Sequence, residues 1–176
     1  MSETEVLLAG FDRDPESGLQ AIIERFERPL VRHARAVLLD TERARDVVQE
    51  TFMRFLTERP RPDNLGGWLY RVSRNLALDI VRKETRRMRL NERLETRHEA
   101  SPEATATLRV DLERAWGKLT PEQREVVFLK VQEGLSYQEI AETIDRPAGT
   151  VGWILHQALK ALATELRPET VAVMRT

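Results

Sequence analysis

The residues with the clearest chemistry lie within 119–166, where the sequence predicts a helix-turn-helix. The second helix of that motif enters the major groove of DNA and contacts base edges there. On this helix Gln157 can bond to adenine and Thr150 to a phosphate, while Trp153 and Ile154 can touch thymine methyl groups. The chemistry expected here is recognition of bases rather than catalysis.

The predicted reading helix is nearly without cations. Between Pro147 and Thr164 the one positively charged residue is Lys160, although Arg and Lys make most of the specific contacts to guanine and to phosphates. The candidate contacts in this part of the chain, to DNA or to a protein, are Lys130, Thr150, Gly152, Trp153, Ile154, His156, Gln157 and Lys160.

Three interpretations of the reading helix stay open. It can read DNA weakly through shape, or Trp153 and Ile154 can form an exposed apolar strip that binds a protein. In the third interpretation the helix register places both residues in the core. Leu155, Leu159 and Leu162 already supply a core stripe at i, i+4 and i+7, which disfavours the third interpretation.

A second chemical feature is a basic strip in the middle of the chain. Residues 66–103 carry 9 basic and 6 acidic side chains, whereas the whole chain has a net charge of −1. Most of this basic charge lies between Arg71 and Arg93. Such a strip is the electrostatic footprint of a phosphate-binding surface, and the alternative is an ordinary solvated helix face.

The composition excludes several classes of protein. The chain has 176 residues, 41% of them hydrophobic and 32% charged, which indicates a globular protein of one or two domains. It has no cysteine, and its three histidines have no ligand spacing, so we expect no disulfide, metal or cofactor. No apolar run approaches the roughly 20 residues of a membrane span and no signal peptide is visible, so we expect a cytoplasmic protein without membrane association.

The elements that position these residues are predicted to be helices throughout, because Ala, Leu, Glu and Arg dominate. Asp14 followed by Pro15 signals the start of one helix. Thr41 is expected to cap the next helix, and a third begins near Trp68. We therefore predict an all-α fold of two small helical domains.

The C-terminal part contains the sharpest end signals. Thr120 to Gln123 and Ser136 to Glu139 both fit the capping box, and Gly134 is placed to stop the helix between them. The predicted helices cover about 107–118, 120–133, 136–144 and 148–165. The expected domains are 1–97 and 108–168, with a linker at 98–107 and a tail at 169–176.

Three motifs of this chain resemble those of the bacterial extracytoplasmic-function (ECF) sigma factors: ARDVVQETFMRFL at 44–56, GGWLYRVSRNLALDIVRKETRR at 66–87 and LTPEQREVVFLKVQEGLSYQEIAETIDRPAGTV at 119–151. These factors are RNA polymerase subunits of the sigma-70 family with two helical domains, sigma region 2 and sigma region 4. The likeness covers nearly the whole chain. It implies a sigma factor that directs transcription initiation at specific promoters and is not an enzyme.

The resemblance assigns a polymerase-docking role to Asp46, Gln49 and Glu50. In the family this D-x-x-Q-E pattern docks on the clamp coiled coil of the polymerase β′ subunit, and the spacing puts all three on one helix face. Family members commonly carry another acid directly before the Asp, where this chain has Arg45, which implies a lower or tuned affinity. The alternative is ordinary pairing of these acids with neighbouring arginines.

The resemblance also implies that the stretch 68–87 recognises and melts the −10 promoter element. Asn75 and Asp79 match an N-x-x-x-D pattern, which can hydrogen-bond a base once it has left the duplex, while basic groups hold phosphates and rings stack on bases. For Trp68 core packing is the favoured alternative, and for Asp79 it is an intrahelical pair with Arg82 or Lys83. The implied contacts are Trp68, Tyr70, Arg71, Arg74, Asn75, Asp79, Arg82, Lys83, Arg86 and Arg87.

The reading helix departs from the family, whose usual pattern after Gly-Thr-Val is K/R-S-R-x-x-R. The matching residues here run from Gly152 to Gln157 without an arginine, so the −35 contacts are not carried over. The expected partners are core RNA polymerase, promoter DNA and, through the apolar helix, an anti-sigma factor or a second copy. Two other functions stay open: a stand-alone helix-turn-helix regulator, and a sigma-like interaction protein that has lost promoter recognition.

Overall fold

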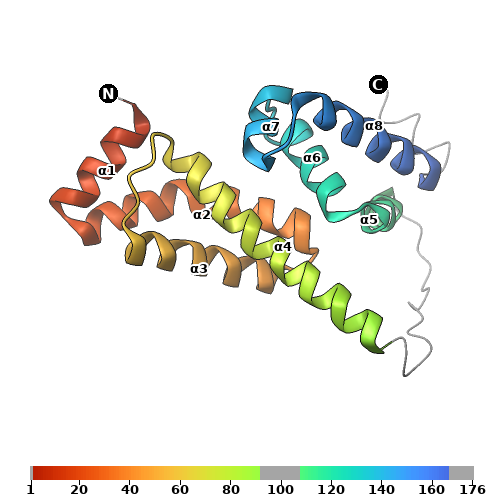
Figure 1. Ribbon diagram of the computed structural model, residues 1–176, viewed down its shortest axis with the longest axis horizontal. Helices are drawn as coiled ribbons and strands as arrows, with labels where there is room; N and C mark the ends of the chain where they lie inside the picture. The colour runs from red at the N-terminus through yellow and green to blue at the C-terminus, as the bar shows by residue number, and fades with distance from the viewer. Residues whose placement is uncertain (1, 92–107, 167–176) are drawn as a thin grey trace. The chain divides into compact units, whose positions relative to one another are not determined.

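The computed structural model describes residues 2–91 and 108–166, and these residues form eight α-helices (Figure 1). The all-α class is confirmed. The helices belong to two compact units, residues 1–80 and 81–176, and α4 (Leu65–Asn91) continues from the first into the second. The predicted linker at 98–107 and the tail at 169–176 lie outside the described residues.

The first two helices are joined by a single residue that serves both. Helix α1 (Glu3–Arg13) ends at Asp14, whose side chain then accepts hydrogen bonds from the backbone N–H groups of Glu16 and Ser17 at the start of α2 (Pro15–Leu38). The predicted start of this helix is thus confirmed. Helix α1 itself is additional to the expected elements, because its short apolar stripe of Leu8 and Phe11 is weak in sequence.

Helix α1 packs on α2 at unusually short range, at Gly18. A Cβ atom on Gly18 would lie 2.3 Å from the Cα of Phe11, so no residue but glycine fits this contact without movement of a backbone. Phe11 is buried there, with its ring centroid 5.1 Å from that of Phe55. The close approach therefore allows α1 to close one end of the hydrophobic core.

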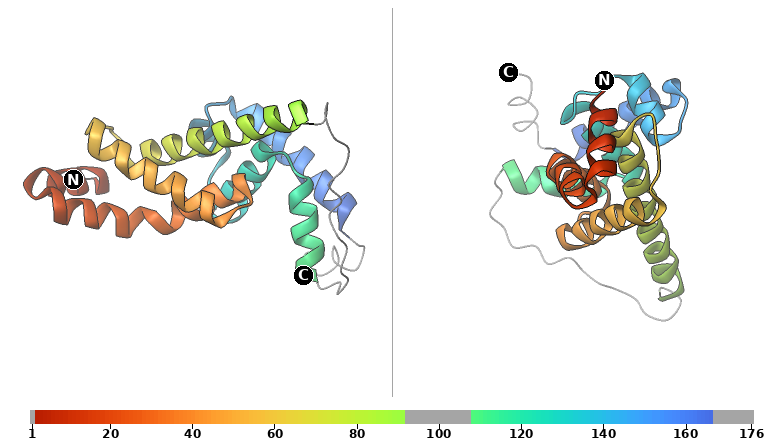
Figure 2. Two further views of the ribbon diagram at one scale, coloured as in Figure 1. Left: turned by 90° about the horizontal axis from the view of Figure 1, so that it is seen from below. Right: turned by 90° about the vertical axis from the view of Figure 1, so that its left-hand side faces the viewer.

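Helix α3 (Thr41–Glu58) lies against α2 as an antiparallel neighbour (Figures 1 and 2). Its N-cap is Asp40, which accepts a hydrogen bond from the Arg43 N–H at 3.1 Å, and Thr41 is the first helical residue. The prediction that Thr41 caps this helix is therefore wrong by one residue. An aspartate one position earlier satisfies the free N–H groups equally well.

Helix α4 begins at Leu65, three residues before the predicted start. The Leu65 N–H donates to the Thr4 hydroxyl of α1 at 3.1 Å, and the side chain of Asn64 accepts from the Gly67 N–H at 2.8 Å. Leu65, Leu69, Ser73 and Ala77 recur every fourth residue and are buried. This stripe fixes which side chains of α4 face outward.

The second unit contains the helix-turn-helix. Helices α5 (Leu108–Lys118), α6 (Pro121–Val131) and α7 (Tyr137–Ile144) each contact α8 (Ala148–Glu165). The four predicted helices are confirmed to within two residues at each end.

The predicted end signals of α6 and α7 are also confirmed. Both capping boxes form, at Thr120 with Gln123 and at Ser136 with Glu139. Gly134 has φ +68°, in the left-handed region that glycine adopts without strain. The backbone N–H and the hydroxyl of Ser136 donate hydrogen bonds to the Glu139 carboxylate. These bonds hold the pKa of that carboxyl below its usual value.

Within residues 2–91 and 108–166, no helix combines the length and apolar character that crossing a bilayer requires.

Candidate nucleic-acid and protein interfaces

The outer face of α3 presents the three residues of the D-x-x-Q-E motif together. The opposite face is buried from Ala44 to Phe55, so Asp46, Gln49 and Glu50 are turned outward and are all exposed. Their i, i+3 and i+4 spacing makes one continuous polar surface. This geometry is compatible with contact to a partner helix.

Ion pairs along α3 leave part of this surface available. Glu50 pairs with Arg54 at 3.2 Å between Oε1 and Nε, and Arg45 pairs with Glu42 one turn before it. Within the described part of the chain, Asp46 takes part in no ion pair. The cation that replaces the family's acid at position 45 is therefore balanced by a local carboxylate.

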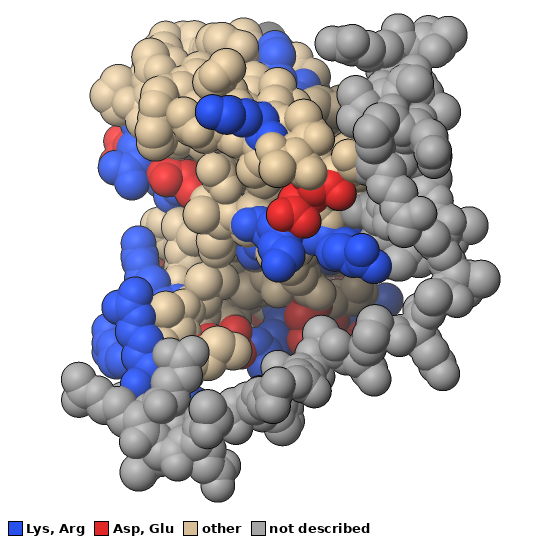
Figure 3. Space-filling view, turned by 90° about the vertical axis from the view of Figure 1, so that its right-hand side faces the viewer, with Lys and Arg blue, Asp and Glu red and all other residues tan. Residues whose placement is uncertain are grey.

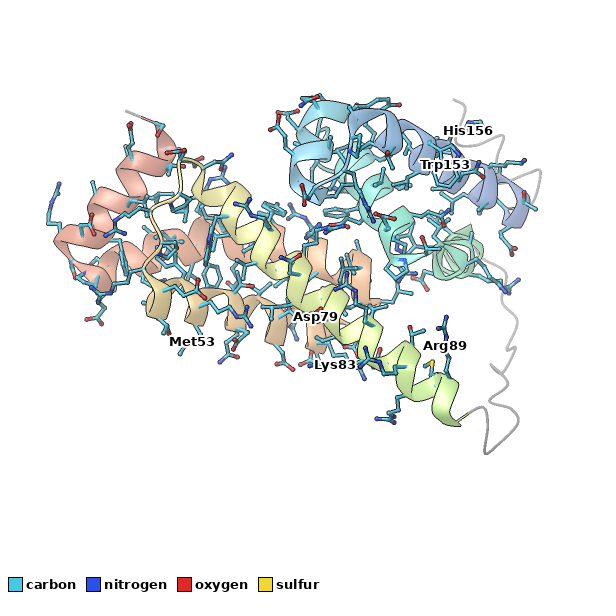
Figure 4. All side chains as sticks on the ribbon, in the orientation of Figure 1. Met53, Asp79, Lys83, Arg89, Trp153 and His156 are labelled. Atoms are coloured by element: carbon cyan, nitrogen blue, oxygen red, sulfur yellow. The ribbon has the colours of Figure 1, made fainter. Side chains whose placement is uncertain are left out.

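Met53 lies on the same face of α3 and was missing from the predicted set. The Met53 side chain points outward from α3 (Figure 4) and is 51% exposed. It follows Asp46 by seven residues and Glu50 by three, a spacing that places all three on one face. The heptad spacing was the signal that could have found it. Met53 adds a flexible apolar contact to an otherwise polar surface.

The exposed side of α4 combines half of the predicted −10 contacts into one stripe. Arg71, Asn75 and Asp79 follow at intervals of four residues and are exposed, and Arg82 and Arg86 continue the stripe. Figure 4 shows Asp79 and Lys83 one turn apart on the C-terminal half of this helix. An amide and a carboxylate thus lie between basic side chains, as base and phosphate contacts would require.

The two predicted aromatic contacts are half-buried and lie apart from each other. The Trp68 ring packs edge-on against Phe55, with centroids 6.1 Å apart, as the core-packing alternative predicts. The Tyr70 ring packs edge-on against His33 at 5.2 Å. Tyr70 thus points away from the exposed stripe, and Arg74 is half-buried, so the structure does not bring all ten predicted residues together.

The last described turns of α4 are strongly basic. From Val81 to Arg89 the sequence has five cations and one acid, and the cations, Arg82, Lys83, Arg86, Arg87 and Arg89, are exposed. Figure 3 shows exposed Lys and Arg side chains grouped along one edge of its view. Closely spaced cations of this kind favour binding to phosphates.

The structure corrects the interpretation of the reading helix. Trp153 is 63% exposed, but Ile154 is 4% exposed and belongs to the core with Val151, Leu155 and Ala158. The predicted exposed Trp153/Ile154 strip is therefore wrong for Ile154. Consecutive residues of a helix point about 100° apart, and on α8 this rotation turns Ile154 into the core while Trp153 stays exposed.

Leu159 is the second correction on α8. It was expected in the core stripe, but it is 49% exposed, and the core continues through Ala158 instead. Leu159 is six residues from Trp153, which turns it about 120° away around the helix. The two exposed apolar side chains of α8 thus form no common patch.

Gly152 and Lys130 occupy structural positions at the turn between helices. A Cβ atom on Gly152 would lie 3.6 Å from the Tyr137 ring, so this exposed ring rests on α8 at the glycine. Lys130 donates to the Leu135 carbonyl at 2.9 Å, and its Nζ lies 5.3 Å from the Tyr137 ring centroid. Tyr137 was not among the predicted residues, and its contacts with Gly152 and Lys130 identify it.

The remaining candidates on α8 divide by exposure. His156 and Lys160 are exposed, and Figure 4 shows His156 close to Trp153 along the helix. Thr150 and Gln157 are half-buried. Arg146, at the turn before α8, pairs with Glu122 at 3.0 Å.

Among residues 2–91 and 108–166, no group of three or more His, Asp or Glu side chains is placed to hold a metal ion.

Comparison with known families divides the chain in the same way as its motifs. The model of Sigma-70 region 2 matches residues 22–87, and that of Sigma-70 region 4 matches residues 109–162. The first match contains the α3 and α4 surfaces, and the second contains the helix-turn-helix.

Curated relatives are ECF sigma factors. SigL of Mycobacterium tuberculosis is 30% identical over 159 residues, which cover 85% of this chain and 89% of SigL. SigE of Mycolicibacterium smegmatis is 37% identical over 129 residues, 68% of this chain, but the match spans 50% of the length of SigE. SigW of Bacillus subtilis is 25% identical over 163 residues, 83% of this chain and 87% of SigW.

Two solved structures share the fold. The sigma factor RpoE of Bartonella quintana, in complex with the anti-sigma factor NepR, has a TM-score of 0.65 at 22% identity and covers 83% of this chain and 94% of its own. CnrH, in complex with the cytosolic domain of CnrY, has the same TM-score and identity and covers 90% of this chain and 94% of its own. With regions 2 and 4 both matched in order, and with relatives of this kind along most of its length, the chain belongs to the sigma-70 family, in the group of ECF RNA polymerase sigma factors.

Proposed function

We propose that this protein binds core RNA polymerase through α3 and recognises and melts the −10 promoter element through α4. The observation that carries the proposal is a pair of exposed stripes of opposite chemistry, one on α3 and one on α4. The α3 stripe contains Asp46 and Glu50, and the α4 stripe contains Arg71, Arg82 and Arg86. A protein that joins a basic helical partner to nucleic acid needs both surfaces.

Docking through α3 requires the Glu50 carboxylate to leave its ion pair with Arg54 and to bind basic side chains of the polymerase instead. The Glu50–Arg54 pair is about half exposed on both sides, and exposed pairs of this kind contribute about 0–1 kcal/mol. A basic coiled coil that shields these carboxylates from water would bind them more strongly than Arg54 does. Met53, beside them, would supply apolar contact area.

Core binding is tested by titrating labelled protein with core polymerase. Glu50→Gln should weaken binding at least tenfold, which corresponds to about 1.4 kcal/mol. Glu58→Gln is the matched control, because Glu58 is exposed on the same helix but about 110° away from the stripe. Arg54→Gln breaks the same ion pair and keeps the carboxylate, so it should bind at least as well as the unchanged protein. Equal affinities for all four proteins would contradict docking through α3.

Melting through α4 needs no catalytic group. Separating the two DNA strands costs roughly 1–2 kcal/mol per base-pair step. Stacking of an unpaired base on the protein offsets this cost by about 1–3 kcal/mol for each base. Asn75 and Asp79 offer a donor and acceptors to an unpaired base edge, and Arg82 and Arg86 can neutralise the strand beside it. The polymerase supplies the active site, so this protein acts as a specificity subunit.

Run-off transcription of fragmented genomic DNA by core polymerase, with and without this protein, tests the second surface. New 5′ ends that share a −10 motif are expected. Asn75→Ala should change which starts are used, because base contacts specify sequence. Arg86→Gln should weaken all starts alike and reduce the slope of log affinity against log salt by about 0.7. Core binding without new starts would instead favour a sigma-like interaction protein, and DNA binding without core polymerase a stand-alone regulator.

An anti-sigma factor is the further partner that we infer for this chain, because the sigma factor RpoE, which shares its fold, was solved with the anti-sigma factor NepR bound. Such a partner should compete with core polymerase. The competition is measured by displacement of the labelled protein from core polymerase, and simultaneous binding of both would contradict this part of the proposal.

A further inference from the structure

The middle of the exposed face of α8 carries a bulky apolar ring among polar neighbours. Gly149, Trp153, His156 and Lys160 are exposed and follow at i, i+4, i+7 and i+11, so they lie along one line of the helix. The Trp153 side chain is 63% exposed, and no atom lies within 4 Å of a Cβ placed on Gly149. Among the described residues, the indole therefore projects from α8 largely open to solvent.

The neighbours of Trp153 fit a groove of DNA better than a protein surface. Protein-binding patches are contiguous apolar areas. Along the exposed line of α8, however, Trp153 is followed by the imidazole of His156 and the ammonium group of Lys160. Leu159, the other exposed apolar side chain of α8, is turned about 120° away. A helix whose N-terminal turns contact bases brings its later turns toward the backbone, where the Lys160 ammonium would meet phosphates.

The side chains near the start of α8 limit which base features this helix can recognise. Reading of guanine relies on Arg or Lys near the start of the helix, but residues 148–159 contain neither, and Arg146 is paired with Glu122. The base feature that an indole recognises in the major groove is the C5-methyl group of thymine, by apolar contact. Ile154 cannot share this role, because it is buried.

We propose that α8 recognises thymine in the upstream (−35) promoter element through contact of the Trp153 indole with its methyl group. This inference rests on the proposed function, since α8 meets promoter DNA only if the protein acts as a sigma subunit. It assigns specificity to one side chain in a helix that lacks the family's arginines.

The test replaces thymine by deoxyuridine in the upstream element of a promoter mapped by run-off transcription, leaving the −10 element unchanged. Deoxyuridine keeps every hydrogen-bonding group of thymine and removes the methyl group alone. Holoenzyme made from core polymerase and the full chain should bind the substituted DNA about fourfold more weakly for each contacted methyl group. Trp153→Ala should lower affinity for thymine DNA by a similar factor and bind both DNAs equally.

Two variants sharpen the experiment. Trp153→Phe keeps an apolar ring and should retain part of the preference for thymine. Leu159→Ala removes the other exposed apolar side chain of α8 and should keep both the affinity and the full preference. A Trp153→Ala holoenzyme that still prefers thymine as strongly as the unchanged one would overturn the inference.

The outcomes separate this inference from the function on which it rests. If Trp153→Ala loses transcription but the unchanged holoenzyme binds both DNAs equally, Trp153 contacts a protein and the inference fails while the sigma function stands. If Trp153→Ala starts transcription at the same sites with the same affinity, the inference also fails alone. If the unchanged protein directs no new starts, both fail together.

Discussion

Replacing Gly18 by alanine should destabilise the first unit, although alanine is normally the better helix residue. The added Cβ would lie 2.3 Å from the Cα and 2.4 Å from the backbone nitrogen of Phe11. Ordinary contacts between carbon atoms are about 3.5–4.0 Å. Because the obstructing atoms are backbone rather than a mobile side chain, α1 must move away from α2 by more than about 1 Å.

The expected cost follows from two opposing effects. Overpacking of a tight contact costs about 1–3 kcal/mol, and contact with backbone atoms favours the upper end of that range. The gain in helix propensity from glycine to alanine is about 1 kcal/mol. We therefore expect a net loss of about 2 kcal/mol, while complete release of Phe11 and Leu8 would cost about 1.5–3 kcal/mol for each side chain.

Tryptophan fluorescence can follow the first unit by itself. The chain has three tryptophans, of which Trp68 lies in the first unit and Trp116 and Trp153 in the second. In a background with the latter two replaced by phenylalanine, urea unfolding monitored at Trp68 reports the first unit alone. With a slope of about 1–2 kcal/mol per M, the Gly18→Ala midpoint should fall by roughly 1–2 M.

The matched control is the same substitution at Gly10. No atom lies within 4 Å of a Cβ placed there, so the propensity gain is unopposed and Gly10→Ala should raise stability by about 0.5–1 kcal/mol. Opposite signs for Gly10 and Gly18 are the signature of the close helix contact. If Gly18→Ala unfolds at the same urea concentration as the unchanged protein, or a higher one, α1 does not pack on α2 as described.

Three further predictions concern caps and packing. Ser136→Ala should destabilise the second unit by about 1 kcal/mol, because the α7 N-terminus loses its side-chain acceptor; urea unfolding followed at Trp116 measures this, and an unchanged midpoint would contradict the cap. The lowered pKa of Glu139 gives stability that is present above the unfolded-state pKa, near 4.5, and is lost as pH falls through the folded-state pKa. Glu139→Gln should thus be less stable than the unchanged protein at pH 7 but approach it in thermal melts below that pKa, and a constant difference would refute the linkage. Leu69→Ala should cost the first unit about 2–5 kcal/mol in urea unfolding, because the side chain is fully buried; a loss under 1 kcal/mol would place Leu69 outside the core.

The helix-turn-helix was predictable because its signals are local. A capping box needs residues three positions apart, and a left-handed stop needs one glycine, so Ser136, Glu139 and Gly134 define helix ends without reference to the rest of the fold. The exposed α3 surface was predictable for the same reason. Its three polar residues repeat with the helical period on the side opposite a continuous apolar stripe.

The faces of α8 were less predictable, because most of its residues are apolar or small. In such a helix periodicity alone does not tell which apolar side chains meet a neighbour. Leu159 and Ile154 were assigned the wrong way round, since the packing of α5, α6 and α7 decides the buried side. Tyr137 was missed because its contact with Gly152 joins residues of different helices.

The sequence by itself determined the all-helical class, the family, the helix ends of the helix-turn-helix and the residue types available for docking and base recognition. These follow from signals within a few residues and from motifs in a fixed order. The tertiary structure alone decided that Trp153 is exposed while Ile154 is buried, that Tyr70 leaves the stripe of Asn75, and that α1 closes the bundle at Gly18. Each of these depends on the distance and rotation between two packed helices, which no local pattern encodes.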